Sequence, residues 1–178
     1  MTQTLVFDNT ALSHFARANQ LGTLGTLCEG FRCVTVQQVI TEIFDGIAQH
    51  AALGTIPILP WLEIRELVEI DDLVAFARYK GELGGGPTKN NGEAGVLAWA
   101  SRHGGTALID EAAATRIGLR DGIDVRGTLW LVTNAYKQKL LTRPEAENIV
   151  DQLAATTMRL PTDGAQLFAW AYAEGLLP

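Results

Sequence analysis

The sequence predicts an α/β protein built around a parallel sheet. Short apolar or β-branched runs, such as Leu5–Asp8 and Thr106–Ile109, alternate with segments whose apolar residues recur at helical spacing. Such alternation is typical of a parallel sheet, because parallel strands are joined by crossover connections that are usually helices. A chain of 178 residues, 47% of them hydrophobic, is long enough to form one domain, residues 1–178, with a complete core.

The first part of the chain predicts two strands, each followed by helical segments. Leu5–Asp8 is the first strand, and Leu12 and Phe15 follow it at helical spacing. The segment LGTLGTLCEG predicts a short helix or turn, and Cys33–Val36 predicts the second strand. An amphipathic helix comes next, with its apolar face formed by Val39, Ile40, Ile43, Phe44 and Ile47.

The middle of the chain predicts an edge strand, a helix and a loop. Ile56–Leu62 contains two prolines and is predicted to be a connection, and Ile64–Val68 is the candidate edge strand. Asp71 or Asp72 is predicted to cap a helix that runs toward Glu82. The segment GELGGGPTKNNG follows, and its glycine, proline and asparagine residues predict a loop bordering a functional site.

The second half of the chain continues the alternation. Its next elements are predicted to be a helix at Ala94–Arg102, a strand at Thr106–Ile109, a helix at Glu111–Arg120, a strand at Ile123–Val125, and helices at Gly127–Tyr136 and Pro144–Leu153. A final strand is predicted at Met158–Leu160. Thr162 is predicted to cap a last helix, residues 162–175. That helix carries three aromatic residues, Phe168, Trp170 and Tyr172.

Four acidic residues lie beside the ends of predicted elements, in LVFDNTAL, VTVQQVITEI, NNGEAGVLAWA and TALIDEAAA; they are Asp8, Glu42, Glu93 and Asp110. Asp8 and Asp110 each end a strand and precede a helix, at the edge where a parallel α/β sheet gathers its functional groups. Converging carboxylates repel one another unless a cation lies between them. Mg²⁺ and Mn²⁺ prefer oxygen ligands, so the four acids predict a Mg²⁺ or Mn²⁺ site suited to phosphodiester hydrolysis.

Each of these acids also fits a purely structural role. Asp8 and Asp110 stand just before helices, where aspartate is a favoured N-cap. Glu93 lies in a first helical turn, where an acid interacts favourably with the helix dipole. Glu42 fits a solvated helix position. The sequence leaves both interpretations open for each residue taken alone, whereas the combination of all of them favours the metal site.

Charge and composition argue against a broadly basic nucleic-acid-binding protein, a disulfide-rich protein and a membrane protein. The net charge of −6, from 14 basic and 20 acidic residues, argues against an extensive basic surface for nucleic acid. If a metal held the four acids, the rest of the chain would carry −2, which leaves room for a local basic rim. Cys28 and Cys33 are too few for a disulfide framework or a zinc site. No secretory signal or bilayer-length apolar run is evident, so we expect a cytoplasmic protein without membrane spans.

Taken in order, LVFDNTAL, VTVQQVITEI, NNGEAGVLAWA and TALIDEAAATRIGLRDGIDVRGTLWLVTNAYKQKLL resemble a PIN domain of the prokaryotic toxin-type branch. The resemblance covers about residues 5–153. It implies a three-layer fold with a five-stranded parallel sheet, and a Mg²⁺- or Mn²⁺-dependent ribonuclease that cuts single-stranded RNA, often as the toxin of a toxin–antitoxin pair. It assigns the acidic positions to Asp8, Glu42, Glu93 and Asp110, and Thr10 matches the hydroxyl residue that follows the first acid.

Some positions depart from the family pattern. Glu93 stands where many PIN domains have aspartate, a change that lengthens the ligand without removing it. Related sequences often carry an arginine shortly after the fourth acid, but Thr115 occupies about that place here and Arg116 comes next. Arg116 is therefore a candidate for positioning the substrate, and it equally fits a solvated helix position. The last helix, residues 162–175, lies beyond the matched region.

Two other functions remain open at this stage. One is a PIN-fold module without catalysis that binds RNA or protein. The other is a phosphotransferase of the haloacid-dehalogenase type, suggested by VFDNT, although Thr10 comes too early for that motif. An RNA substrate, an antitoxin protein and a homodimer are the partners that the preferred interpretation implies.

Overall fold

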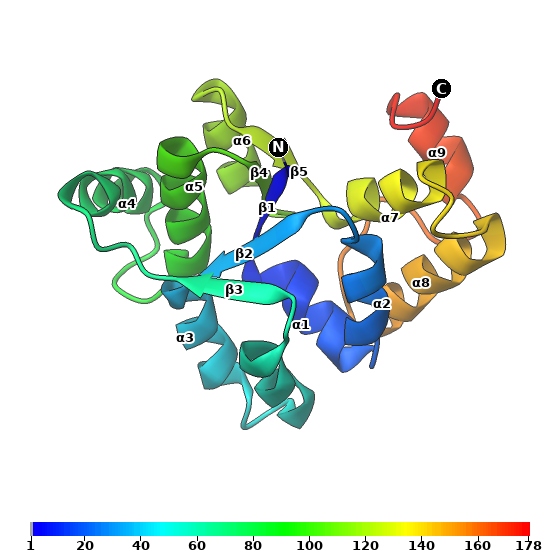
Figure 1. Ribbon diagram of the computed structural model, residues 1–178, viewed down its shortest axis with the longest axis horizontal. Coiled ribbons are helices and arrows are strands. Elements are labelled where there is room, and N and C mark those ends of the chain that lie inside the picture. The colour runs from blue at the N-terminus through cyan, green and yellow to red at the C-terminus, as the bar shows by residue number, and fades with distance from the viewer. Residues whose placement is uncertain (1) are drawn as a thin grey trace.

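A five-stranded parallel sheet forms the centre of the computed structural model, which describes residues 2–178 (Figure 1). The strands are β1 (Thr4–Phe7), β2 (Arg32–Val36), β3 (Leu62–Arg65), β4 (Thr106–Leu108) and β5 (Asp124–Arg126). Their spatial order is β3-β2-β1-β4-β5, and every neighbouring pair is parallel. The α/β class and the five-stranded parallel sheet expected from the sequence are confirmed.

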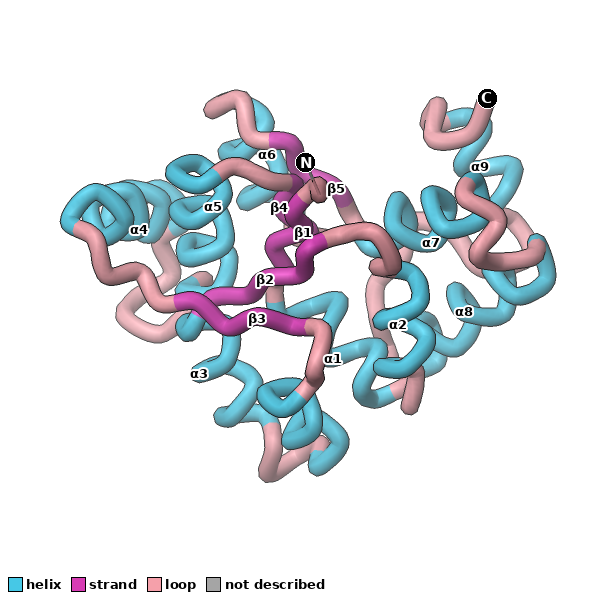
Figure 2. Tube along the Cα trace, viewed as in Figure 1, coloured by secondary structure: helices cyan, strands magenta, loops and turns pink. Residues whose placement is uncertain are grey.

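Helices surround the sheet, as the cyan coils around the magenta strands show in Figure 2. They are α1 (Asn9–Arg17), α2 (Leu21–Leu27), α3 (Gln37–Gly46), the 3-10 helix η1 (Ala51–Ile58), α4 (Ile70–Leu83), α5 (Asn91–His103), α6 (Ala112–Arg120), α7 (Thr128–Lys137), α8 (Arg143–Ala155) and α9 (Leu167–Ala173). In Figure 1, α4 and α5 lie together on the left and α7, α8 and α9 on the right, with the strands between them.

The register of the central strands brings their carboxyl ends to one edge. Phe7, the last residue of β1, pairs with Thr35 in β2 and with Leu108 in β4. The next residue, Asp8, donates its backbone N–H to the carbonyl oxygen of Leu108 at 3.2 Å. Side chains that follow β1, β2 and β4 therefore emerge close together, as expected for a parallel α/β sheet.

Burial of β1 explains why that strand is entirely apolar. Leu5, Val6 and Phe7 have no exposed surface, because helices cover both faces of a central parallel strand. The amphipathic α1 presents Leu12 and Phe15 to the same core, and both side chains are fully buried. The hydrophobic effect of burying these side chains holds Asp8, which lies between β1 and α1, in a fixed position.

Several predicted boundaries were wrong. The edge strand β3 begins at Leu62 rather than Ile64, because Leu62 pairs with Cys33 of β2, and the prolines before it lie in or next to η1. Neither Asp71 nor Asp72 caps α4; both lie in its first turn, after the N-cap Glu69.

The C-terminal region also differs from the prediction. Residues 158–160 form no strand; Met158 instead buries its side chain in the core. The last helix, α9, begins at Leu167 after the N-cap Gln166, so Thr162 does not cap it. Phe168 of α9 meets Tyr136 of α7 edge to face, with 4.8 Å between ring centroids, and this contact holds α9 against α7.

Within residues 2–178, no helix combines the length and the apolar character needed to cross a bilayer.

Candidate metal centre

Three of the four predicted acids come together at the carboxyl edge of the sheet. Asp8 follows β1, Glu42 lies on α3 and Glu93 lies in the first turn of α5. One carboxylate oxygen of each lies within 4.8 Å of the others, close enough to ligate one ion. Asp8 is almost completely buried, at 1% exposure, and the two glutamates are partly buried.

The two oxygens of Asp8 have different surroundings. Oδ2 accepts hydrogen bonds from the backbone N–H and the hydroxyl of Thr10, at 3.4 and 3.3 Å, and so caps α1. Oδ1 is buried and has no hydrogen-bond partner among the described residues. A buried carboxylate oxygen without a partner is costly, because folding removes its water and replaces it with nothing. A bound cation would satisfy this atom.

Gly92 allows the start of α5 to approach the acids closely. Its N–H donates to Oε1 of Glu42 at 2.7 Å. A Cβ atom at this position would lie 2.6 Å from Oε2 of Glu42, closer than real Cβ contacts allow, and 3.1 Å from Oδ1 of Asp8, which is a tight contact. The space beside Gly92 therefore belongs to the carboxylate oxygens, and the sequence keeps it free by placing glycine there.

Burial and like charge both oppose ionisation of these acids. Burial, the repulsion from Glu93 and that from Glu42 raise the pKa of Asp8 to about 8. Burial also raises the pKa of Glu42, although the hydrogen bond from Gly92 and the charge of Lys80 partly offset it. A divalent cation would reverse this balance by favouring the charged carboxylates. The donor set consists of carboxylate oxygens alone, which suits Mg²⁺ or Mn²⁺.

A family model described as a PIN domain matches residues 4–168. The chain belongs to the PIN-domain family. PIN domains are generally metal-dependent nucleases, which agrees with the cluster of Asp8, Glu42 and Glu93. The match continues past residue 153 through α8 and into α9, further than the sequence motifs indicated. Neither a search of curated proteins nor one of solved structures returned a match.

Asp110, the fourth acid of the predicted PIN-domain site, does not join the group of three. Its two oxygens accept hydrogen bonds from the backbone N–H of Thr128 at 2.8 Å and from the Thr128 hydroxyl at 2.6 Å. Burial raises the pKa of Asp110, and the two bonds from Thr128 counteract that rise. Asp110 thus joins the end of β4 to the start of α7. The expected N-cap role at α6 falls instead to Glu111, whose side chain accepts from Ala114 N–H.

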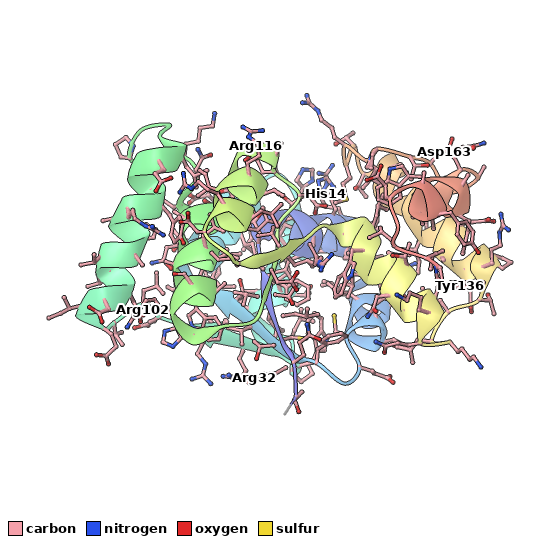
Figure 3. The ribbon with its side chains drawn as sticks, turned by 90° about the horizontal axis from the view of Figure 1, so that it is seen from above. His14, Arg32, Arg102, Arg116, Tyr136 and Asp163 are labelled. Carbon is pink, nitrogen blue, oxygen red and sulfur yellow. The ribbon has the colours of Figure 1, made fainter. Side chains whose placement is uncertain are left out.

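Thr10 and Arg116, the two residues predicted to position the substrate, lie in different surroundings. Thr10 donates its hydroxyl to Asp8, so it orients a predicted ligand of the PIN-domain centre. Arg116 is exposed on α6, and Figure 3 shows it at the outer edge of that helix. It makes no ion pair with the described acids, while the neighbouring Thr115 lines a pocket together with Asp110.

Sequence reasoning missed three residues that shape the PIN-domain centre. Gly92 was signalled only by its place before Glu93 in NNGEAG. Thr128 follows Gly127 in the Gly-Thr motif, but its bond to Asp110 spans 18 positions. Lys80 on α4 carries a positive charge near Glu42 and donates to the backbone of Lys89 in the loop before α5. No local pattern marks Lys80, because only the packing of α4 against α5 brings it near the acids.

We expect Gly92→Ala to abolish metal binding while leaving the fold intact. The new methyl group would displace the oxygens of Glu42 and Asp8, and alanine is otherwise the better helix former by about 1 kcal/mol. Calorimetric titration with Mn²⁺, with circular dichroism as the folding control, measures both effects. Gly22→Ala on α2, where a Cβ meets nothing within 4 Å, is the matched control and should bind like the parent. Normal Mn²⁺ binding by Gly92→Ala would contradict the proposed position of the ion.

We expect the metal-free protein to lose stability relative to Asp8→Asn as the pH rises from about 4 to about 8. The raised pKa of Asp8 means that the unfolded chain releases this proton at lower pH than the folded chain, so folding becomes less favourable across that interval. Thermal unfolding in a chelator at several pH values measures the difference. It should grow by more than about 3 °C, roughly 1 kcal/mol for a domain of this size. A difference in unfolding temperature that stays constant with pH would show that the pKa of Asp8 is not raised in the folded protein.

Proposed function

We propose that this chain is a Mg²⁺- or Mn²⁺-dependent endoribonuclease that hydrolyses phosphodiester bonds of single-stranded RNA. Two observations on Asp8 carry the proposal. Its buried Oδ1 has no hydrogen-bond partner among the described residues, and a carboxylate oxygen of Asp8 lies within 4.8 Å of one from Glu42 and one from Glu93. Family membership supports nuclease chemistry in general. The choice of RNA and of an internal cut rests on the resemblance to toxin-type PIN domains.

The residues of the site have distinct roles in this proposal. Asp8, Glu42 and Glu93 would hold the ion. Asp110, the fourth acid, follows the neighbouring strand β4 and is held by its two hydrogen bonds from Thr128. When bound, a divalent ion supplies a lowered pKa for the attacking water and positive charge for the leaving oxygen. Thr10 orients Asp8, and the N–H of Gly92 orients Glu42. Lys80 and the N-terminus of α5 add positive potential where the phosphate would lie.

We further propose that the enzyme acts in the cytoplasm as a toxin restrained by an antitoxin protein. The toxin-type resemblance supports this role. So does a group of exposed apolar side chains at the start of α4, which a protein partner or a second copy could cover: Val68, Ile70, Leu73 and Val74. Expression of the isolated chain should slow growth, and co-expression of the protein encoded beside it should relieve the effect.

The alternative is a PIN-fold module that binds RNA or protein without catalysis. It differs from the enzyme in one measurable respect, because only the enzyme requires the acids to bind metal together. The phosphotransferase alternative is disfavoured by membership of the PIN-domain family and by the clustering of Asp8 with Glu42 and Glu93. A nucleophilic aspartate would need an open path to the phosphorus atom.

Added Mn²⁺ should raise the unfolding temperature of the parent protein. Ligand binding to the folded state alone stabilises it by about 2.7 kcal/mol when the free ion is 100 times its dissociation constant. Differential scanning fluorimetry with a Mn²⁺ series measures the shift. Asp8→Asn should show little or none of it. No shift for the parent at millimolar Mn²⁺, combined with no calorimetric binding, would remove the metal site from the proposal.

Asp8→Asn should reduce the cleavage rate of a mixed-sequence single-stranded RNA by at least about 100-fold, because it removes the charge that binds the ion. The fold should persist, since asparagine caps a helix nearly as well as aspartate. Asp45→Asn is the control: it removes the same charge from an exposed position on α3 and should cut like the parent. Asp110→Asn should also lose most activity, and Glu42→Gln less. If Asp8→Asn and Asp110→Asn both cleave RNA as fast as the parent, the acids have structural roles only.

A further inference from the structure

An open pocket of about 670 Å³ begins at Asp110 and extends toward the C-terminal segment. One wall comes from the end of β4 and the start of α6, the second from β5 and the first turn of α7, and the third from residues 159–161 and α9. Figure 3 shows α6 and the C-terminal segment on either side of the start of α7. The volume is ample for one nucleotide, since ligand pockets commonly measure about 300–1,000 Å³.

The lining of this pocket combines aromatic surface with positive charge. Trp130 and Trp170, two of the four tryptophans, both line it. Trp130 is fixed from one side by the edge of Phe31, at 6.4 Å between ring centroids, and Trp170 is partly exposed. Indole faces are good stacking surfaces for nucleobases, whatever the base. Two aromatic residues of α9 therefore have different roles: Phe168 is buried in the core, and Trp170 lines the pocket.

Two arginines supply the charge. Arg126 lies over the ring of Trp130, at 5.8 Å from its centroid, and also pairs with Asp124 at 2.8 Å. Arg159 is exposed, and within residues 2–178 no acidic side chain pairs with it. Glu174, an exposed residue of the lining, would repel an anion, so we place the phosphate of a ligand beside Arg159. Asp124 already balances Arg126, which leaves Arg159 as the cation free to meet a phosphate.

The pocket lies next to the metal centre. Asp8 N–H donates to the carbonyl of Leu108, and the next two residues along that strand end, Ile109 and Asp110, are the inner wall of the pocket. Adjacent parallel strands lie about 4.8 Å apart, so the inner wall begins about one strand spacing from Asp8.

We propose that this pocket is a nucleotide subsite, in which a base close to the scissile phosphate lies against Trp130 and Trp170 while its phosphate contacts Arg159. The proposal rests on the ribonuclease function above and adds where the substrate strand is held. In such a subsite base stacking contributes to affinity beside a local positive charge, so we expect it to operate on a protein that is acidic overall.

The test measures RNA binding in a chelator, so that no cleavage is needed. A short, fluorescein-labelled single-stranded RNA of mixed sequence is titrated with the parent, Arg159→Glu and Trp170→Leu, and binding is followed by fluorescence anisotropy. Each pocket variant should bind about tenfold more weakly, as expected for loss of one stacking or phosphate contact. Lys137→Glu, which makes the same charge change in the last turn of α7, is the matched control and should bind like the parent.

A second measurement locates the base. RNAs carrying a single abasic nucleotide at successive positions should show one position at which affinity for the parent falls. Abasic RNA at that position should lose nothing further with Trp170→Leu, because the same contact is already missing. Arg159→Glu provides the independent arm if circular dichroism shows that Trp170→Leu disturbs the fold, since Arg159 lies exposed in an irregular segment.

The outcomes separate this proposal from the ribonuclease function. If the pocket variants cleave RNA with a raised KM and an unchanged kcat, both hold. If they cleave and bind like the parent, the subsite is wrong and the nuclease stands. If the parent cuts nothing but the pocket variants lose RNA binding, the subsite stands on a non-catalytic module. Unchanged RNA binding with lost binding of the neighbouring gene's protein would assign the pocket to a protein partner and overturn the subsite.

Discussion

The close approach of α5 to α3 is the constraint on which the acidic site depends. Gly92 and Gly95 lie one turn apart on the face of α5 that meets α3, and a Cβ atom on either would collide with side chains of the facing elements. At Gly92 the facing atoms are carboxylate oxygens; at Gly95 they include Val36 and Oε1 of Gln38, another buried oxygen without a partner. With larger residues at these positions, α5 would move outward and carry Glu93 away from Asp8.

The same approach creates an energetic conflict that the rest of the site moderates. Three carboxylates converge in a partly buried space, which favours their neutral forms. The bonds from Thr10 and Gly92, and the nearby charge of Lys80, each favour the ionised forms but leave Oδ1 of Asp8 without a partner. Such a site is organised before its cation arrives, because the hydrophobic burial of β1 and α1, rather than the ion, fixes the position of Asp8.

The sequence predicted those features that follow from local pattern. Alternating apolar runs located four of the five strands within two residues, and the motif order placed Asp8 and Asp110 after adjacent strands. Features set by tertiary contacts could not be predicted from the sequence. Pairing with β2 set the start of β3. Met158 packs in the core and forms no sixth strand. Asp110, which follows β4, is bonded to Thr128 at the start of α7. The pocket was invisible for the same reason, since its walls come from four separate segments.

Gly92 also has an evolutionary consequence. One base change converts any glycine codon to an alanine codon, and alanine would strengthen the helix while filling the space beside the carboxylates. A single mutation can therefore disrupt the metal site while the rest of the fold is retained. A descendant that carried this change would keep the core of β1 and α1 and lose the space for the ion. The residue at this position would then distinguish active from inactive descendants, even where every acid had been retained.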